Sequence, residues 1–221
     1  MRSGALSLTE LESVRIRKAG RPTAQETEQL NETIVRAALR VFTAKGIAAS
    51  TMEQIAEEAG TTRRSIAHRF ASKDDLVLAV IEQSADEYRQ EVFKPAAVFA
   101  GQPLEAIKQA CRAMFERVCQ DDFVAFHRLV IAETAKNIRA GEVMIQISNR
   151  FAEELDILVA RAQREGVFAH QISSATAIGL IGVFLANPLN RRAFGDPQFR
   201  DEERQAKYFE SLWALVAHAS A

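Results

Sequence analysis

The chain has 221 residues, with 28 Lys and Arg against 29 Asp and Glu, giving a formal net charge of −1. This balance excludes a generally basic protein that coats nucleic acid, so any DNA binding must come from a local basic patch. Glycine and proline are sparse and apolar residues recur at intervals of three and four, which predicts an all-α protein.

The chain also lacks the sequence signals of membrane insertion and export. No apolar run of about 18 or more residues is free of polar breaks, so no membrane partner is expected. Residues 1–18 lack the continuous apolar core of a signal peptide, and a cytoplasmic location is predicted. Cys111 and Cys119 fall on one expected helix about 12 Å apart, too far for a disulfide between them.

Residues 1–26 are predicted to form a flexible basic arm. Arg15, Arg17, Lys18 and Arg21 cluster around a Gly and a Pro. Two roles fit such an arm: contact with DNA phosphates or the minor groove through Arg17 and Arg21, or a solubilising tail without contacts.

Residues 26–45 have the periodicity of a helix that ends at Gly46. The helix carries no side chains suited to reading DNA, and it is interpreted as a scaffold for the helices that follow. Its apolar stripe is Leu30, Ile34, Ala37, Ala38, Val41 and Phe42.

Residues 50–73 predict two short helices joined by a tight turn. Thr51 and Gln54 have capping-box spacing, and Gly60 can supply the left-handed residue that ends the first helix. Thr62 can cap the second helix, in which Ile66 and Phe70 lie on the buried side. This pattern is typical of a DNA-reading helix-turn-helix.

The distribution of charge favours DNA binding over a generic pair of helices. A helix–glycine–helix pattern is common in all-α proteins, and a charge run is often only a solvated face. Here the second helix and the turn after it lack acids before Asp74, whereas the first helix is acidic. Basic charge confined to one helix suits phosphate contact. The basic residues of the second helix are Arg63, Arg64, His68 and Arg69.

Ser72 is expected to cap a further helix, with Asp74 and Asp75 favoured at its N-terminus. This helix is predicted to run to about Phe93 and to end at Pro95. It is too long for a small DNA-binding head alone, and it is interpreted as the connector into a second domain.

Four segments together resemble the N-terminal domain of the tetracycline-repressor (TetR) family of bacterial regulators. They are AALRVFTAKG (37–46), TMEQIAEEAG (51–60), IAHRF (66–70) and SKDDL (72–76), within a match over roughly residues 28–91. The resemblance implies a homodimer whose subunits each have three DNA-binding helices and a larger helical ligand-binding and dimerisation domain. The expected division is an arm at 1–26, a DNA-binding domain at 27–91, and an effector-binding and dimerisation domain at 92–221.

The resemblance also implies roles for individual residues. Thr51 and Lys73 correspond to phosphate contacts, and Arg69 lies near the DNA backbone. A helical wheel with Ile66 and Phe70 inward independently places Arg64, Ser65 and His68 farthest from the core. The predicted DNA-binding set is Thr51, Thr62, Arg63, Arg64, Ser65, His68, Arg69 and Lys73, with Arg17 and Arg21 from the arm.

Three positions depart from the family pattern. Ala67 stands where the family usually has an aromatic residue, Arg69 where it has His or Tyr, and Arg64 where it has a small residue or Pro. An aromatic contact is therefore missing, and Arg64 and Arg69 are expected to supply part of the phosphate or guanine contact. Which arginine reads bases is left open.

Residues 96–221 resemble the family only loosely and are expected to form further helices. Gly141 is predicted to break the chain between two of them, and Pro188 to end another. The expected helices span 103–120, 122–138, 143–164, 174–186 and 201–219.

An apolar cavity for a small apolar or aromatic effector is expected among these helices. Aromatic stripes at helical spacing are more often ordinary core, and a lone His127 is more often a packed or surface histidine than a ligand contact. The candidate lining residues are Cys111, Met114, Phe115, Phe123, Phe126, His127, Met144, Phe151 and Phe184.

Two helices suggest a dimer. Residues 175–186 are almost wholly apolar and need cover all round, and the last helix has a large apolar face. The alternative is that both helices belong to the core of a monomer. The candidate interface residues are Ile178, Gly179, Gly182, Phe209 and Trp213.

The sequence therefore predicts a sequence-specific DNA-binding transcriptional regulator, a repressor released from operator DNA by a small lipophilic effector. The alternative is a ligand-independent TetR-like or architectural DNA-binding factor. An enzyme is not expected, because the four histidines are scattered and there is no phosphate-binding glycine loop, HExxH or CxxC motif. No cofactor or metal is expected. The operator sequence, the effector and the regulated genes stay open.

Overall fold

The computed structural model describes residues 23–167 and 175–218, and these residues form helices without any strand. The predicted all-α fold is confirmed. None of the helices in these two ranges is long and apolar enough to cross a membrane. Most of the predicted arm, including Arg17 and Arg21, lies outside the described residues.

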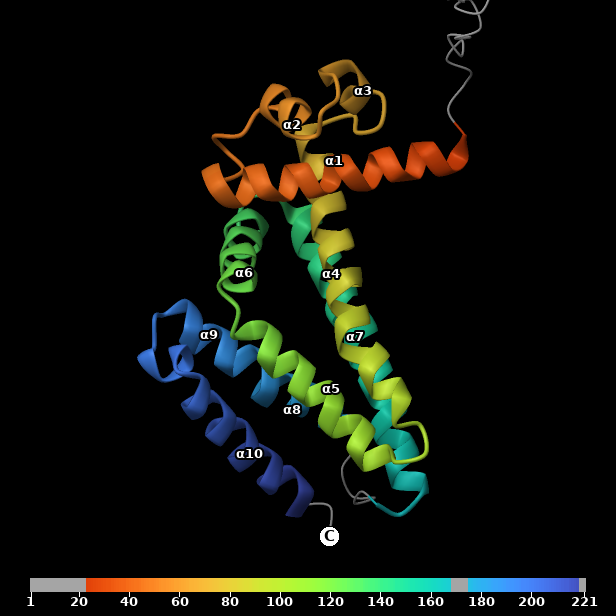
Figure 1. The fold of residues 1–221 in the computed structure, drawn as a ribbon, viewed down its shortest axis with the longest axis vertical. Coiled ribbons are helices and arrows are strands. Elements are labelled where there is room, and N and C mark those ends of the chain that lie inside the picture. The colour runs from red at the N-terminus through yellow and green to blue at the C-terminus, as the bar shows by residue number, and fades with distance from the viewer. Residues whose placement is uncertain (1–22, 168–174, 219–221) are drawn as a thin grey trace, which may run out of the picture.

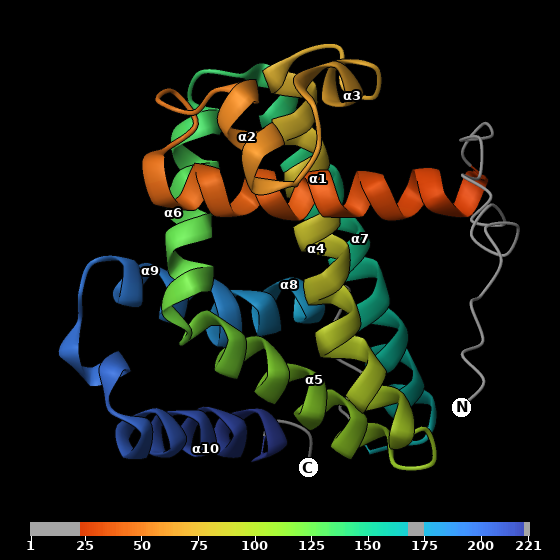
Figure 2. The ribbon, with the colours of Figure 1, turned by 45° about the horizontal axis from the view of Figure 1, so that its top comes forward.

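The N-terminal part of the molecule is a compact head. Helix α1 (Ala24–Lys45) crosses one end of the molecule, and α2 (Met52–Glu58) and α3 (Arg63–Ala67) lie on its outer side (Figure 1). Figure 2 shows the same pair above α1, at the end of the molecule far from α10. The three helices enclose a fully buried core with the start of α4 (Lys73–Val98). This core includes Ile34, Phe42, Ile55, Ile66 and Leu76.

Local capping sets where these helices begin. The hydroxyls of Thr51, Thr62 and Ser72 each accept a hydrogen bond from the backbone N–H three residues later, as predicted. Thr51 and Gln54 complete the predicted capping box. Gly60 has φ +61, a left-handed conformation that L side chains rarely adopt, and it makes the turn between α2 and α3.

Helix α4 continues past the predicted end at Phe93. Pro95 lies inside the helix, which runs to Val98. A proline in a helix interior removes one backbone hydrogen bond. Val92 and Ala96 are fully buried on either side of Pro95, and their packing offsets this loss.

The C-terminal part places further helices around α4. Helix α7 (Ile138–Arg164) packs along α4, and α5 (Pro103–Val118) contacts both (Figure 1). Helix α6 (Asp121–Thr134) connects α5 to the head, where it contacts α1. The remaining elements are α8 (Ala175–Ile181), a π-helical turn η1 (Gly182–Ala186), α9 (Asn187–Ala193), a 3-10 turn η2 (Pro197–Arg200) and α10 (Glu202–His218).

Two predicted helix breaks are wrong. Gly141 lies within α7, and the chain instead breaks just before Asn137, whose side chain caps α7 by accepting from the N–H groups of Arg139 and Ala140. Pro188 lies inside a continuous helical run from Ala175 to Ala193, directly after the π-helical turn η1, so it does not end the helix.

Aromatic side chains build the core between α5, η1 and α10. Phe209 of α10 has its ring centroid 5.7 Å from that of Phe115 and 5.3 Å from that of Phe184. Cys111 and Cys119 are buried as free thiols. Burial raises the pKa of Cys119 to about 11, so this thiol stays protonated at neutral pH.

Candidate DNA-binding surface and ligand cavity

Helix α3 presents basic side chains on the outer surface of the head. Ile66 is fully buried beneath it, which fixes the face that α3 turns outward. Arg63, Arg64 and His68 are exposed, and Ser65 is half-buried. The structure therefore brings the predicted groove-facing residues together on one surface.

The three arginines of this surface have different partners. Arg63 Nε lies 3.1 Å from Glu53 Oε1 in an exposed pair of the kind that contributes little and exchanges readily. Arg69, in the turn after α3, is half-buried, and its Nη1 donates back to the backbone oxygen of Ser65 at 2.9 Å. Within the described ranges, Arg64 makes no ion pair or side-chain hydrogen bond. Arg64 is thus the arginine most available to a ligand.

Lys73 is directed into the protein. Its Nζ donates to the backbone oxygens of Ile47 at 2.8 Å and Ser50 at 3.1 Å. These two carbonyls belong to the loop between α1 and α2, so Lys73 holds that loop against the first turn of α4. The phosphate contact expected of Lys73 would have to be made by an ammonium group already bonded to two carbonyls. Lys73 thus positions the loop that leads into Thr51, and the third N–H of its ammonium group is left for the phosphate contact, which stays a prediction.

An apolar cavity of about 180 Å³ lies between α4, α6, α7 and the α8–α9 segment. Five of the nine predicted lining residues contact it: Phe123, Phe126, His127, Met144 and Phe151. The other four do not line it, because they are buried in the packed core of α5 and η1: Cys111, Met114, Phe115 and Phe184.

Sequence reasoning missed the wall that α4 contributes to this cavity. The α4 residues that line the cavity have the same apolar spacing as the α4 residues that pack in the core. The sequence therefore carries no signal that separates the two sets. The missed lining residues are Ile81, Ser84, Ala85, Tyr88, Val130, Ile147, Ser148, Ile181, Leu185 and Leu189.

The cavity is suited to uncharged groups. None of its lining residues is Asp, Glu, Lys or Arg. Desolvation lowers the pKa of His127, so the imidazole is neutral at physiological pH. The polar groups that remain are the hydroxyls of Ser84, Tyr88 and Ser148 together with His127, a small number of the kind that orients a ligand in an apolar site.

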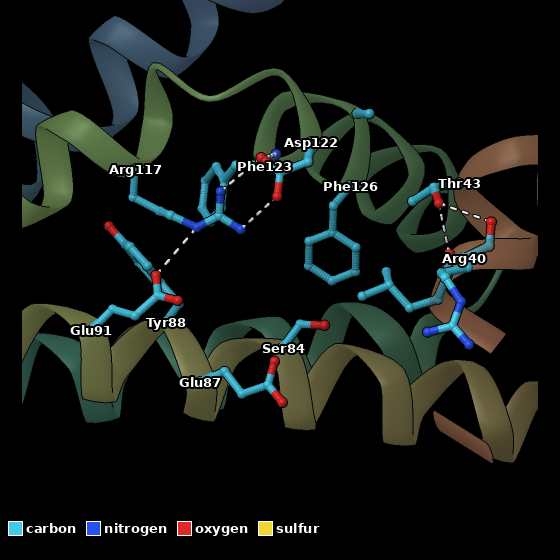
Figure 3. A pocket seen from close by; sticks show the side chains of 12 residues that line it. Arg40, Thr43, Ser84, Glu87, Tyr88, Glu91, Arg117, Asp122, Phe123 and Phe126 are labelled. Carbon is cyan, nitrogen blue, oxygen red and sulfur yellow. Dashed lines mark hydrogen bonds and ion pairs between the residues drawn. The ribbon is translucent and has the colours of Figure 1, made fainter. Parts of the chain in front are cut away.

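A second cavity of about 360 Å³ lies beside the first, between α1, α4 and α6 (Figure 3). One end of this cavity is formed by Arg117 of α5, whose side chain pairs with carboxylates of two other helices, α4 and α6. Its Nη1 lies 2.8 Å from Asp122 Oδ1 on α6, and its Nε lies 3.3 Å from Glu91 Oε2 on α4. The hydrogen bonds from Arg117 lower the pKa of Asp122, which stays ionised.

The predicted interface residues fall into two groups. Ile178 is 66 % exposed, and a Cβ added at Gly179 or Gly182 would have no heavy atom within 4 Å. Among the described residues, none therefore covers this face of the apolar helix. Phe209 and Trp213 are instead 2 % and 7 % exposed in the subunit's own core, which corrects their placement. Among the described side chains of α10, the large apolar one that is exposed is Leu215.

Family models match most of the chain. Residues 34–80 match the model described as bacterial regulatory proteins, tetR family. Residues 105–214 match the model described as AefR-like transcriptional repressor, C-terminal domain. The two matches cover most of the head and the helices around the cavity except the part of α4 that lines it.

Individual proteins are similar over most of their length. The HTH-type transcriptional regulator SrpR of Pseudomonas putida is 26 % identical over 203 residues, 89 % of each chain. The HTH-type transcriptional repressor BepR of Brucella suis is 27 % identical over 188 residues, 81 % of this chain and 88 % of BepR. A crystal structure of a TetR-family regulator from Mesorhizobium loti has a TM-score of 0.77 at 17 % identity, over 89 % of this chain and 98 % of that one, which shows the same fold.

Replacing Lys73 with Met should destabilise the protein. The carbonyls of Ile47 and Ser50 would lose a charged donor, at a cost of about 1–3 kcal/mol in the free energy of unfolding, measured by urea denaturation. Lys45→Met is the matched control, because Lys45 is exposed in the same head and should change stability by less than about 0.5 kcal/mol. Equal stability of the two variants would refute the positioning role of Lys73.

Proposed function

This chain belongs to the tetR family of bacterial regulatory proteins, and from this we propose that it represses transcription until a small effector enters its apolar cavity. Like its relatives, the chain is a DNA-binding transcriptional regulator. It is not an enzyme. The name of BepR, a repressor, supports repression as the mode of regulation. We further propose residues 27–91 as the DNA-binding domain, residues 92–221 as the effector-binding and dimerisation domain, and a cytoplasmic location.

One observation carries the release mechanism: a single helix reaches from the DNA-binding head to the cavity. Lys73 and Leu76 at the start of α4 hold the head, whereas Ser84 and Tyr88 line the cavity. Lys73 and Tyr88 are separated by about 22 Å of continuous helix. A ligand that displaces the middle of α4 therefore also tilts its first turn, whose Leu76 shares the core of the head with Ile66 of α3.

The coupling depends on a difference in affinity. A ligand shifts the equilibrium only if it binds the arrangement that cannot hold DNA more tightly than the one that can. The ligand-independent alternative would be favoured by a solid C-terminal core. The cavity of about 180 Å³ supports effector binding instead.

We propose that a second copy of the chain covers the exposed face of α8 and η1. This face includes Ile178 and Val183. Gly179 and Gly182, which have no side chain, would allow a close approach of two backbones. A two-fold dimer suits DNA because it can set two α3 helices about 34–36 Å apart, in successive major grooves.

Replacing Arg64 with Ala should reduce discrimination between DNA sequences. The loss of a bidentate guanine contact would weaken operator binding by about 1–3 kcal/mol, with little change on scrambled DNA. Genomic fragments selected on the purified protein would supply the operator, and fluorescence anisotropy at fixed salt would measure both affinities. Arg150→Ala removes an exposed charge from α7 and should change neither affinity. Equal losses on operator and scrambled DNA would mean that Arg64 contacts phosphate only.

Replacing Gly179 with Leu should convert the proposed dimer to a monomer. A Cβ at this position meets no heavy atom within 4 Å in the subunit itself, so the fold should be retained, and the longer side chain would project into the contact with the second copy. Analytical ultracentrifugation measures the mass, and circular dichroism checks the fold. Gly141→Leu also adds a side chain in open space, on α7, and should leave the dimer intact. A Gly179→Leu variant that is still dimeric would place the interface elsewhere.

A further inference from the structure

The helical run that forms one wall of the apolar cavity is not a regular α-helix. Helix α8, the turn η1 and helix α9 follow one another without a break from Ala175 to Ala193. In η1 the N–H of Asn187 donates to the carbonyl of Gly182, five residues earlier instead of four. Figure 2 shows the run crossing from α7, beside α8, to α6, beside α9. A π-helical turn of this kind contains one residue more than an α-helical turn, and such turns are frequent at functional sites.

The extra residue aligns side chains along the cavity. Ile181, Leu185 and Leu189 all line it: one precedes the turn, one lies in it and one follows it. In a straight α-helix, residues eight apart are rotated by about 80° with respect to each other. The π-helical turn absorbs one residue, which leaves seven effective steps and reduces this angle to about 20°. The turn therefore brings Ile181 and Leu189 into one row that faces the cavity.

Pro188 provides a physical cause for the turn. Its ring nitrogen carries no hydrogen, so it cannot donate to the carbonyl of Phe184, four residues earlier. In a straight α-helix the ring would also clash with that carbonyl. Pro188 is buried, so the ring has to be accommodated inside the packed helix. A wider turn directly before the proline moves the carbonyl away from the ring, and the run continues through Pro188.

The other proline inside a described helix shows that a second condition is needed. Pro95 lies within α4 without a π-helical turn, and α4 ends soon after it, at Val98. The helix after Pro188 is held in place instead, because Arg192 Nη2 lies 2.7 Å from Asp121 Oδ1 at the start of α6. Since α9 is fixed to α6, it cannot tilt away from the proline, and the turn before the proline absorbs the change.

We propose that Pro188 is a positioning residue of the effector site: it enforces the π-helical turn, and the turn sets the cavity wall formed by Ile181, Leu185 and Leu189. Pro188 is not itself a lining residue, so it acts through these three side chains. This inference rests on the proposed function of the cavity as the effector site, and it assigns one determinant of that site's specificity.

The test is isothermal titration calorimetry of the full chain with indole, a neutral probe of two fused rings. The cavity of about 180 Å³ is somewhat larger than one that holds benzene, about 150 Å³. Pro188→Ala restores the N–H and allows a straight α-helix, which would turn Leu189 out of the row of Ile181 by about 100°. Indole affinity should fall about tenfold, because a leucine contact is lost.

Stability separates positioning from a purely structural role. The free energy of unfolding of Pro188→Ala, measured by urea denaturation, should not fall, because alanine is favoured over proline in a helix interior. A structural proline would lose stability and binding together. Pro95→Ala is the matched control, because it removes a helical proline outside the cavity and should leave indole affinity unchanged.

A second variant should rescue binding. Deleting Ala186 in the Pro188→Ala background removes the extra residue of the turn. Ile181 and Leu189 are then seven steps apart in a straight α-helix, and they align again. Indole binding should recover in this variant. A loss of binding that the deletion leaves uncorrected would overturn the proposal, as would a Pro188→Ala variant that binds indole like the wild-type chain.

A crystal structure of Pro188→Ala gives a readout that needs no ligand. It should show an α-helix without a π-helical turn between α8 and α9, and a turn that persists would refute the role of Pro188. Operator binding in the presence of indole tests the proposed function separately. Indole that binds through the aligned wall but leaves operator affinity unchanged would contradict effector release and support the positioning role. No binding of indole to the wild-type chain up to millimolar concentration would count against the cavity as the effector site, and loss of the turn in Pro188→Ala would still support Pro188 as its cause.

Discussion

The structure depends on the burial of helix α4 in two cores at once. Leu76 and Ile81 pack in the core of the DNA-binding head, and Val92 and Ala96 pack in the core formed with α5 and α7. A continuous helix is stiff along its axis, so the two cores cannot shift independently. Burying an aliphatic side chain contributes about 1.5–3 kcal/mol, far more than the exposed ion pairs that also join the two parts. The head is therefore oriented by apolar packing, and its charges are left for DNA.

Between these two cores the packing of α4 is incomplete. At Ser84 and Ala85 the helix faces a cavity instead of close-packed side chains. Protein interiors are normally dense, so atoms that line a void lose part of their dispersion energy. A ligand that fills the void restores those contacts, and it does so at the point of α4 where a displacement moves the head. Under the proposed release mechanism, occupancy of the cavity would act on the helix that links the two cores.

Features that depend on neighbours in sequence were predictable, and features that depend on distant packing were not. The caps at Thr51, Thr62 and Ser72 involve residues three positions apart, and each formed as expected. The bonds from Lys73 reach carbonyls 23 and 26 residues away, which no local pattern encodes. The helix-breaking tendency of Pro95 was likewise overridden by the burial of its neighbours.

The remaining difficulty is that an amphipathic pattern shows which face of a helix is apolar but not what covers it. Phe209 and Trp213 satisfy an interface pattern and a core pattern equally, and only the position of α5 and η1 decides for the core. The same ambiguity governs α3, where Arg64 and Arg69 are both basic and close in sequence. Ile66 fixes the helix so that Arg69 folds back on the carbonyl of Ser65 while Arg64 extends to solvent. Since a side chain bonded to its own helix must break that bond to reach a base, we infer that Arg64 is the better placed of the two to read sequence.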